Sequence, residues 1–375
     1  CTIVEKIIYR LIMKLENTVK SQIKNLPVYE TGKPIEYVAR EFGLDPDGIL
    51  KMASNENPLG ASPKAVEAVS KHLGTLNYYP DGGCYELRQK LSKKWNLKPS
   101  QFAFGNGSNE ILEFIAQCFV DRGDETVFGA QSFIVYKLAT IFMGGKCVSV
   151  PMPNLKYDLD ALRDAVSDKT KIVFMTNPNN PTGCVVKQSE VENFVRSLPE
   201  HVVFCYDEAY TEYQDEQVDL RPLIAEGRNV ICLRTFSKIY GLAGLRIGYS
   251  YSSEELAGYI NRVREPFNVN SLAQVGAMAA LDDTEFVAES KRVNDAGRKQ
   301  FVEAFEKNGL TYFSDGANFV MVKVKDAPQV FVEMQKRGVI VRPNVGYGLP
   351  EWLRITIGKP EQNARCIDEL LKFAK

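Results

Sequence analysis

The sequence predicts an α/β fold, with a mainly parallel seven-stranded sheet in a large domain and a smaller α+β domain beside it. The first observation is that short apolar segments alternate with helix-length segments from Ser54 onward, as right-handed crossovers between parallel strands require. The second is that the helices become longer and the strands fewer beyond about Ser271. With 375 residues, 45% of them hydrophobic, the chain is large enough for both cores.

The individual elements follow from local patterns. Ser62 before Pro63 is typical of a helix start, because Ser caps the first amides and Pro has no amide to satisfy. On this helix we expect Ala65, Val66, Val69 and Leu73 to face inward, and in the smaller domain we expect a long helix over 285–308. The expected strands are 102–104, 126–128, 146–150, 171–176, 202–206, 230–234 and 246–250 in the sheet, and 318–324, 338–341 and 353–357 in the smaller domain.

These patterns divide the chain into four expected parts. Residues 1–13 are apolar but interrupted by charges, and no small-residue cleavage site follows them. We therefore expect an upstream extension or an expression artefact there, rather than a signal peptide or a native amphipathic arm. The other parts are an N-terminal arm that belongs partly to the small domain (14–60), the large domain (61–280) and the C-terminal small domain (281–375).

Composition excludes several classes of function. The 46 basic and 47 acidic side chains leave a formal net charge of −1, which argues against nucleic acid as the main partner. The eight cysteines include no CxxC pair, so we expect reduced core thiols in a cytoplasmic protein. Two histidines are too few for a multi-histidine zinc site, and we expect no metal. No apolar run approaches the roughly 18 residues of a membrane span.

An acid and an amine stand where two buried strands end. Asp207 follows the apolar segment 202–206, and Lys238 follows 230–234 within RTFSK. Carboxyl ends of strands are where ligands bind in open α/β sheets. Taken singly, an Asp there is more often a helix cap and a Lys a solvated loop charge. Together, an amine that can form a Schiff base and an acid that can hold a pyridinium nitrogen are the minimum equipment for pyridoxal phosphate.

Neighbouring motifs supply partners for the rest of this cofactor. Thr235, Ser237 and Arg246 together can hold a dianionic phosphate, with the guanidinium supplying a fork of donors. The GNGSN turn (105–109) suits a phosphate at a helix N-terminus, or is simply a tight turn. Glu110 stands where a dinucleotide fingerprint requires its third glycine, so that alternative fails.

Two further side chains can reach the ring oxygen of the cofactor. NPNNPTG (177–183) is a rigid turn in any interpretation, and Asn180 can donate a hydrogen bond to a phenolate oxygen from it. Tyr210, three residues after Asp207, either packs in the core or reaches the same oxygen.

These motifs resemble a known family. NPNNPTG, DEAY (207–210), TFSK (235–238) and GLAGLRIGY (241–249), in this order and spacing, are similar to the fold-type-I pyridoxal-phosphate-dependent aminotransferases. In more detail the chain resembles the histidinol-phosphate aminotransferases, from about Leu26 to its end. The added motifs are NENPLGASP (55–63), NYYPDG (77–82), REPFNVNSLAQ (264–274), GVIVRP (338–343) and GYGLPEWLRITIG (346–358).

The resemblance implies a role for each matching residue. Lys238 would be the Schiff-base lysine and proton shuttle, Asp207 the pyridinium partner, and Tyr210 with Asn180 the donors to the ring oxygen. Phe133 matches the aromatic residue that stacks on the ring, although Gln131 stands where the family usually has a proline. The phosphate would be held by Ser108, Asn109, Ser237 and Arg246.

The same resemblance implies a substrate side and a homodimer. Tyr79 matches a residue that reaches the cofactor from the partner subunit. Arg354 matches the arginine that binds the substrate anion, with Tyr29, Asn55 and Arg342 as further substrate-side residues. The implied reaction transfers the amino group of histidinol phosphate to 2-oxoglutarate, giving imidazole-acetol phosphate and glutamate in histidine biosynthesis.

Other functions remain open from the sequence alone. On the same fold, an aromatic amino-acid aminotransferase would transfer a different amine, and a threonine-phosphate decarboxylase would release CO₂. A pyridoxal-phosphate-binding transcription regulator would need an added DNA-binding domain, and no helix-turn-helix pattern precedes the first family motif. A purely structural protein would have no need for Lys238, Asp207 and Tyr210 together.

Overall fold

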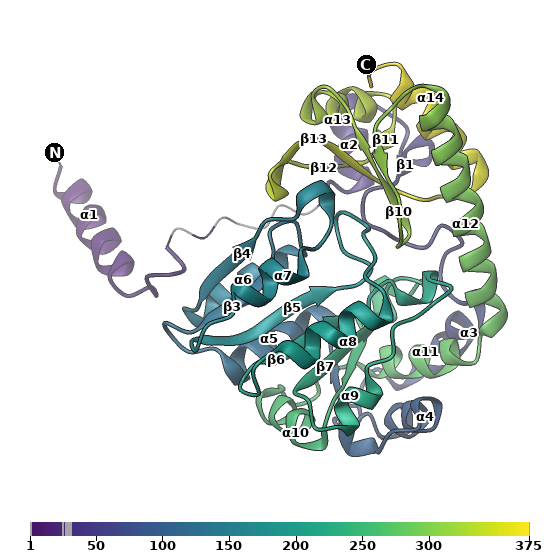
Figure 1. Cartoon of the computed structure of the whole chain (residues 1–375). Coiled ribbons are helices and arrows are strands. Elements are labelled where there is room, and N and C mark those ends of the chain that lie inside the picture. The colour runs from purple at the N-terminus through teal and green to yellow at the C-terminus, as the bar shows by residue number, and fades with distance from the viewer. Residues whose placement is uncertain (1, 25, 27–31, 375) are drawn as a thin grey trace.

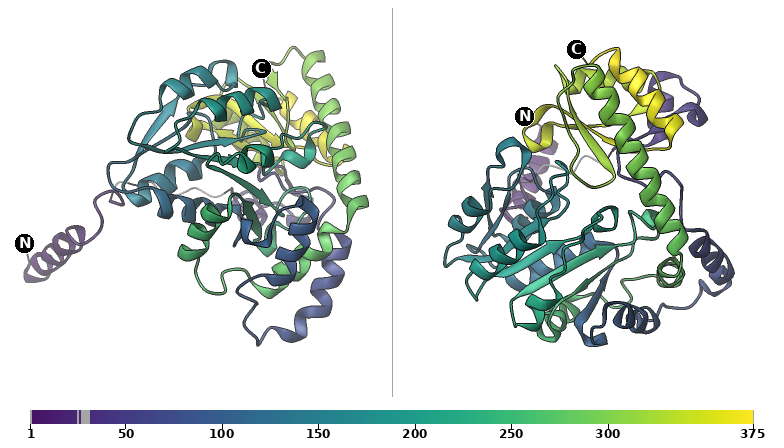
Figure 2. Two further views of the ribbon diagram at one scale, coloured as in Figure 1. Left: turned by 60° about the horizontal axis from the view of Figure 1, so that its bottom comes forward. Right: turned by 45° about the vertical axis from the view of Figure 1, so that its right-hand side comes forward.

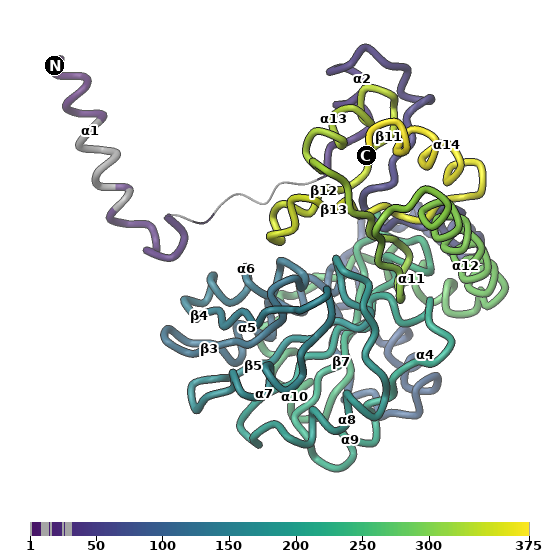
Figure 3. Tube along the Cα trace, turned by 45° about the horizontal axis from the view of Figure 1, so that its top comes forward, coloured from purple at the N-terminus to yellow at the C-terminus, as the bar shows by residue number. Residues whose placement is uncertain are grey.

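The computed structural model describes residues 2–24, 26 and 32–374. Two lobes lie one above the other in Figure 1, and helix α12 (Thr284–Lys307) runs along both. Helix α1 (Ile3–Glu16) lies apart from both lobes in Figure 1, in the left view of Figure 2 and in Figure 3. None of the helices in the described ranges combines the length and apolar character that a membrane crossing requires.

The larger lobe is built on one seven-stranded sheet of order β2-β8-β7-β6-β5-β3-β4. Strand β8 is antiparallel to both of its neighbours, and the other pairs are parallel. The predicted mainly parallel seven-stranded sheet is therefore confirmed. The strands are β2 (Phe102–Gly105), β3 (Glu125–Gly129), β4 (Lys146–Val150), β5 (Thr170–Thr176), β6 (Val203–Asp207), β7 (Val230–Thr235) and β8 (Gly248–Tyr251).

Helices cover both faces of this sheet (Figure 1). Cys205 on β6 packs in the cluster under α5, α6 and α10, whereas Phe204 and Tyr206 pack in the cluster on the opposite face. Side chains alternate along a strand, so a strand covered on both faces is apolar throughout. The helices are α3 (Pro63–His72), α4 (Tyr85–Trp95), α5 (Ser108–Phe119), α6 (Ile134–Met143), α7 (Leu159–Asp164), α8 (Gln188–Ser197), α9 (Arg221–Ala225), α10 (Glu254–Val263) and α11 (Ser271–Leu281).

Helix α3 shows one correct and one wrong expectation. Ser62 caps it, accepting a hydrogen bond from the Ala65 amide at 3.3 Å, and Pro63 is its first residue. Ala65 is buried, as predicted, but Val66 and Leu73 are 51% and 50% exposed, so the prediction that these two side chains face inward is wrong. Periodicity locates an apolar stripe but does not tell which surface covers it.

The smaller lobe combines segments from both ends of the chain. Strand β1 (Leu50–Lys51) pairs in parallel with β11 (Val339–Ile340), and Leu50 joins the same core as Phe301 and Phe305 of α12. The second sheet has the order β12-β13-β10-β9. The remaining elements are α2 (Ile35–Phe42), β9 (Tyr312–Phe313), β10 (Phe319–Lys323), α13 (Ala327–Lys336), β12 (Arg342–Asn344), β13 (Leu349–Thr356) and α14 (Pro360–Leu371).

Candidate active site

A cavity of about 630 Å³ opens at the carboxyl ends of β5, β6 and β7. This is the edge of an open α/β sheet at which ligands bind. The fold brings most of the predicted site residues together there, from segments far apart in the sequence. Those that line the cavity are Ser108, Asn109, Phe133, Asn180, Asp207, Tyr210, Thr235, Ser237, Lys238 and Arg246.

Lys238 lies in the turn after β7, close against an earlier part of the chain. Gly241 has a φ of 68°, and a Cβ there would overlap the carbonyl of Gly60, so glycine allows the two segments to touch. The Lys238 Nζ donates to the Ser54 carbonyl at 3.3 Å. Burial, together with the nearby Arg354 guanidinium, lowers the pKa of Lys238 to about 8. Such an amine is partly neutral near physiological pH and can act as a nucleophile.

Asp207 ends β6 and faces the layer that contains α6. Tyr136 of that helix donates its hydroxyl to Asp207 Oδ2 at 3.1 Å, and the Ala209 amide donates to Oδ1 at 3.1 Å. Burial raises the pKa of Asp207 to about 6, although both hydrogen bonds lower it. A buried carboxylate with neutral donors as its nearest partners favours a cationic group beside it, because a buried charge is costly without compensation.

Tyr210 and Asn180 line the wall between the two lobes. Tyr210 is held edge-on by Phe319, with ring centroids 5.5 Å apart, and its hydroxyl accepts a hydrogen bond from Asn55 Nδ2 at 2.9 Å. Asn180 Oδ1 accepts from Arg354 Nη1 at 2.5 Å. Its amide nitrogen is therefore the end left to donate to a ligand.

The opposite end of the cavity is suited to an anion. Gly107, with a φ of 86°, is the N-cap of the 12-residue helix α5, and a Cβ there would overlap the Arg246 guanidinium. Glycine therefore lets this cation lie against the first turn of the helix, where free amides and the helix dipole attract negative charge. Ser237 adds a hydroxyl on the same side, and its amide donates to Thr235 Oγ1 at 3.1 Å.

Several predicted residues do not line the cavity. Arg354 lies just beside it, held by Asn180 and by the Ala53 carbonyl, the latter at 2.9 Å. Arg342 is the cross-strand partner of Arg354 on β12. Asn55 is 1% exposed, and its amide contacts Tyr210 rather than the open space.

Two other predictions fall elsewhere. Tyr79 is 83% exposed, and its ring stacks on Phe267 of the same chain with centroids 4.9 Å apart. Tyr29 lies outside the residues that the structure describes. The roles expected for both therefore remain predictions.

Three of the contributors that were not predicted from the sequence contact predicted site residues or line the cavity with a charge. Tyr136 lies on an apolar helix, and a tyrosine one turn after Phe133 gave little sign that it would reach Asp207. The Ser54 carbonyl carries no side-chain signal at all. Glu56 also lines the cavity and pairs with Lys51 at 2.8 Å; its place in the NENPLG motif was the available clue.

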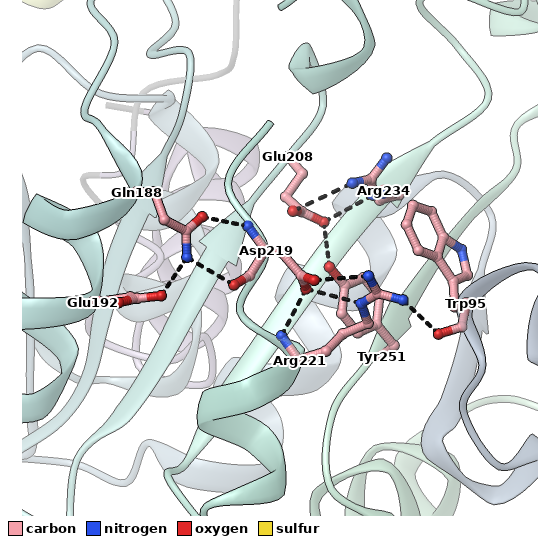
Figure 4. A network of polar contacts seen from close by, with 8 residues as sticks. All are labelled: Trp95, Gln188, Glu192, Glu208, Asp219, Arg221, Arg234 and Tyr251. Carbon is pink, nitrogen blue, oxygen red and sulfur yellow. Dashed lines mark hydrogen bonds and ion pairs between the residues drawn. The ribbon is translucent and has the colours of Figure 1, made fainter. Parts of the chain in front are cut away.

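A polar network that includes Glu208, the residue after Asp207, lies on the other face of the sheet (Figure 4). Glu208 accepts hydrogen bonds from Arg234 Nε at 2.9 Å and from the Tyr251 hydroxyl at 2.9 Å. The Arg234 guanidinium lies over the ring of Trp95, 4.3 Å from its centroid. This network joins the end of β6 to the end of β7, the two strands that carry Asp207 and Thr235.

Comparison with known proteins agrees with this geometry. The family model for aminotransferase class I and II matches residues 47–370. The chain belongs to the class I and II aminotransferases. The resemblance found in the sequence is thereby confirmed.

Several members of this aminotransferase family are closely similar to the chain. It is 44% identical to the histidinol-phosphate aminotransferase of Akkermansia muciniphila, over 96% of this chain and 99% of that one. It is 46% identical to the enzyme of the same name from Brevibacillus brevis, over 94% and 97%. The solved histidinol-phosphate aminotransferase of Sinorhizobium meliloti, in complex with pyridoxal-5'-phosphate, has a TM-score of 0.84 at 26% identity and covers 94% of this chain and 97% of its own.

Proposed function

We propose that this aminotransferase uses pyridoxal phosphate to transfer the amino group of histidinol phosphate to 2-oxoglutarate, a step of histidine biosynthesis. The observation that carries the proposal is one cavity that joins an amine of lowered pKa, Lys238, to a buried and poorly compensated carboxylate, Asp207. The names of the most similar relatives support the choice of substrate.

The residues of the cavity fit this cofactor. Glycine at 107 leaves space that a Cβ would fill, so a phosphate can approach both the helix N-terminus and Arg246. Lys238 would bind the aldehyde carbon, Asp207 the ring nitrogen, and Tyr210 with Asn180 the ring oxygen. When bound, the cofactor accepts the electrons released as the Cα proton of the substrate leaves.

Side chains of the protein would carry out the proton transfer and control the charge of the ring. Lys238, with a pKa of about 8, is partly neutral at physiological pH. It would remove the proton from the substrate's Cα and return it to the cofactor carbon that comes from the aldehyde. Asp207 keeps a negative charge at the ring nitrogen, which favours the protonated and electron-accepting form of the ring. Tyr210 stays a hydrogen-bond donor because burial raises its pKa to about 12.

The substrate anion is assigned to Arg354. Arg354 is 7% exposed, and its guanidinium lies between Asn180 and the Ala53 carbonyl, beside the cavity. A planar fork pairs well with a carboxylate or a phosphate ester, which both half-reactions require. Arg342, across the strand pair, and Tyr29 are proposed to favour the more highly charged phosphate.

The active form is proposed to be a homodimer with Tyr79 near the partner's cavity. Support comes from large apolar side chains exposed around this residue, since extended apolar patches mark contact surfaces. Static light scattering should give twice the chain mass of 42.1 kDa. A fully active monomer would contradict this part of the proposal. The exposed residues are Leu76, Tyr78, Tyr79, Tyr85 and Phe267.

A cytoplasmic location is part of the same proposal. It is supported by the cysteines in the described part of the chain, all of which are free, as is usual in a reducing compartment.

The test is an amine-donor panel with purified protein and 2-oxoglutarate. The panel contains histidinol phosphate, unphosphorylated histidinol, phenylalanine and threonine phosphate, with CO₂ release measured in parallel. We expect a strong preference for histidinol phosphate, and for Arg354→Ala a loss of roughly 2–5 kcal/mol in transition-state binding, the scale for truncating one partner of a buried charge pair. Equal kcat/KM for phenylalanine would favour an aromatic aminotransferase, and CO₂ release from threonine phosphate a decarboxylase.

A further inference from the structure

Asn55 is placed to act on Tyr210 rather than on a substrate. It adopts a left-handed backbone conformation, with a φ of 56°, and is 1% exposed. A polar side chain this deeply buried must be satisfied within the protein. Its amide spans the two lobes, from Tyr210 after β6 to Thr356 at the end of β13.

The direction of each hydrogen bond in this chain of contacts can be deduced. The Asn55 backbone N–H can only donate, and it donates to Thr356 Oγ1 at 2.9 Å. The single hydroxyl hydrogen of Thr356 is then directed to Asn55 Oδ1, 3.2 Å away. This orients the amide, because a flipped amide would place two donors on Oγ1 and deprive the threonine hydrogen of its acceptor. The Asn55 Nδ2 therefore faces Tyr210 and donates to it at 2.9 Å.

The consequence falls on the Tyr210 hydroxyl. Its oxygen accepts from Asn55, so its own hydrogen is left for an acceptor in the cavity that Tyr210 lines. Burial raises the pKa of Tyr210 to about 12, so the phenol keeps this hydrogen at neutral pH. Tyr210 is thus fixed as a donor before any ligand arrives.

Strand β13 also orients the second donor, the amide nitrogen of Asn180. Arg354 lies two residues before Thr356 on β13, and side chains at this spacing share a face of the sheet. An arginine can only donate, so its contact with Asn180 Oδ1 leaves the Asn180 amide nitrogen for the cavity. Strand β13 of the smaller lobe therefore orients both the Tyr210 hydroxyl and the Asn180 amide as hydrogen-bond donors to the cavity.

We propose that Asn55 and Thr356 are positioning residues that make Tyr210 a hydrogen-bond donor to the cofactor's ring oxygen. The proposal rests on the proposed function for the identity of the cofactor. It replaces the substrate-binding role expected for Asn55 with an action through Tyr210. A donor to a phenolate oxygen stabilises its deprotonated form, so losing the donor should raise the pH at which the bound cofactor changes colour.

The test measures this pH midpoint by visible absorbance of the loaded protein, without substrate. Asn55→Asp tolerates the same backbone conformation but offers Tyr210 an acceptor, which turns its hydrogen away from the cavity. Thr356→Val keeps the shape and removes the hydroxyl, and Thr356→Ser is the matched control. We expect Asn55→Asp to raise the midpoint by about 0.5–1 pH unit, Thr356→Val by less, and Thr356→Ser not at all.

A second background separates this role from a purely structural one. In Tyr210→Phe the midpoint should already be raised, and Thr356→Val should not move it further. Asn55→Asp should then add only the through-space effect of its new carboxylate, a smaller shift than it causes when the Tyr210 hydroxyl is present. Equal shifts with and without the Tyr210 hydroxyl, or no shift in either variant, would overturn the proposal. A wild-type protein that shows no cofactor absorbance would overturn the proposed function and this role with it. Normal absorbance, with midpoint shifts that do not depend on the Tyr210 hydroxyl, would overturn this role alone.

Discussion

Two neighbouring carboxylates at the end of β6 have opposite surroundings. Asp207 faces the cavity side of the sheet and has the Tyr136 hydroxyl and the Ala209 amide as its partners. Glu208 faces the other side, where the Arg234 guanidinium and the Tyr251 hydroxyl hold it (Figure 4). Both are buried, and burial raises the pKa of each. The difference is that Glu208 is hydrogen-bonded to a cation, whereas the two hydrogen-bond donors to Asp207 are neutral.

This difference gives two consecutive residues different roles, one in ligand binding and one in stability. A buried charge with a hydrogen-bonded cation is compensated within the protein, and removing one partner leaves the other unpaired. A buried charge with neutral donors alone destabilises the empty protein and favours a cationic group from outside. We infer that Glu208 aligns the ends of β6 and β7, and that Asp207 is left poorly compensated because it serves a ligand.

The largest expected effect is on catalysis at Asp207. Asp207→Asn should lower kcat by about 10²–10⁴-fold, because the ring nitrogen loses its negative partner. The folded-state pKa of Asp207 is raised from 3.8 to about 6, so its ionisation costs stability that is lost as pH rises between these two values and stays lost above them. At pH 7 the cofactor-free variant should therefore be more stable than wild type, by roughly 1–3 kcal/mol in denaturant unfolding. A variant that is less stable and fully active would reverse the comparison.

The next effect is on stability at Arg234. Arg234→Met should destabilise the cofactor-free protein by about 3–5 kcal/mol, because Glu208 remains buried without its cation. The double variant Glu208→Gln, Arg234→Met should recover much of this loss, and a double-mutant cycle measures the coupling. Additive losses would show that the two side chains do not act as a pair.

A smaller loss is expected at Tyr251. Tyr251→Phe removes one donor to the Glu208 carboxylate and should cost roughly 1.5–3 kcal/mol of unfolding free energy. The matched control is Tyr136→Phe, which removes the equivalent donor to Asp207 and should shift the pH dependence of activity. Equal effects of the two variants on both properties would remove the distinction between the two faces.

The smallest effect concerns the pH dependence of cofactor capture by Lys238. Only the neutral amine attacks an aldehyde, and burial lowers its pKa to about 8. The capture rate, followed by stopped-flow absorbance, should rise about tenfold from pH 7 to pH 9 and then level off. A rate still rising steeply above pH 10 would indicate an ordinary exposed lysine.

Much of this site could be predicted because its residues follow apolar strands. Asp207 and Lys238 are recognisable where buried segments end, and the parallel sheet brings such ends together. The pairing of Glu208 with Arg234 was not predicted. It depends on the register that sets Asp207 opposite Leu233, and on the alternation that turns Glu208 to the other face.

Contacts between distant segments could not be read from the sequence. Tyr136 reaches Asp207 from a helix whose pattern indicated only a buried face. Asn55 was expected on the substrate side, but a left-handed backbone and a partner on β13 direct its amide to Tyr210. Such contacts depend on how the two lobes pack, which local periodicity does not encode.

The most direct test of the account is to locate the amine that binds the cofactor. The loaded protein is reduced with borohydride and digested, and the labelled peptide is identified by mass spectrometry. We expect a single label on Lys238 and none in Lys238→Ala, with the exposed Lys299 unlabelled in both. A label on another lysine, or none in the wild-type protein, would contradict it.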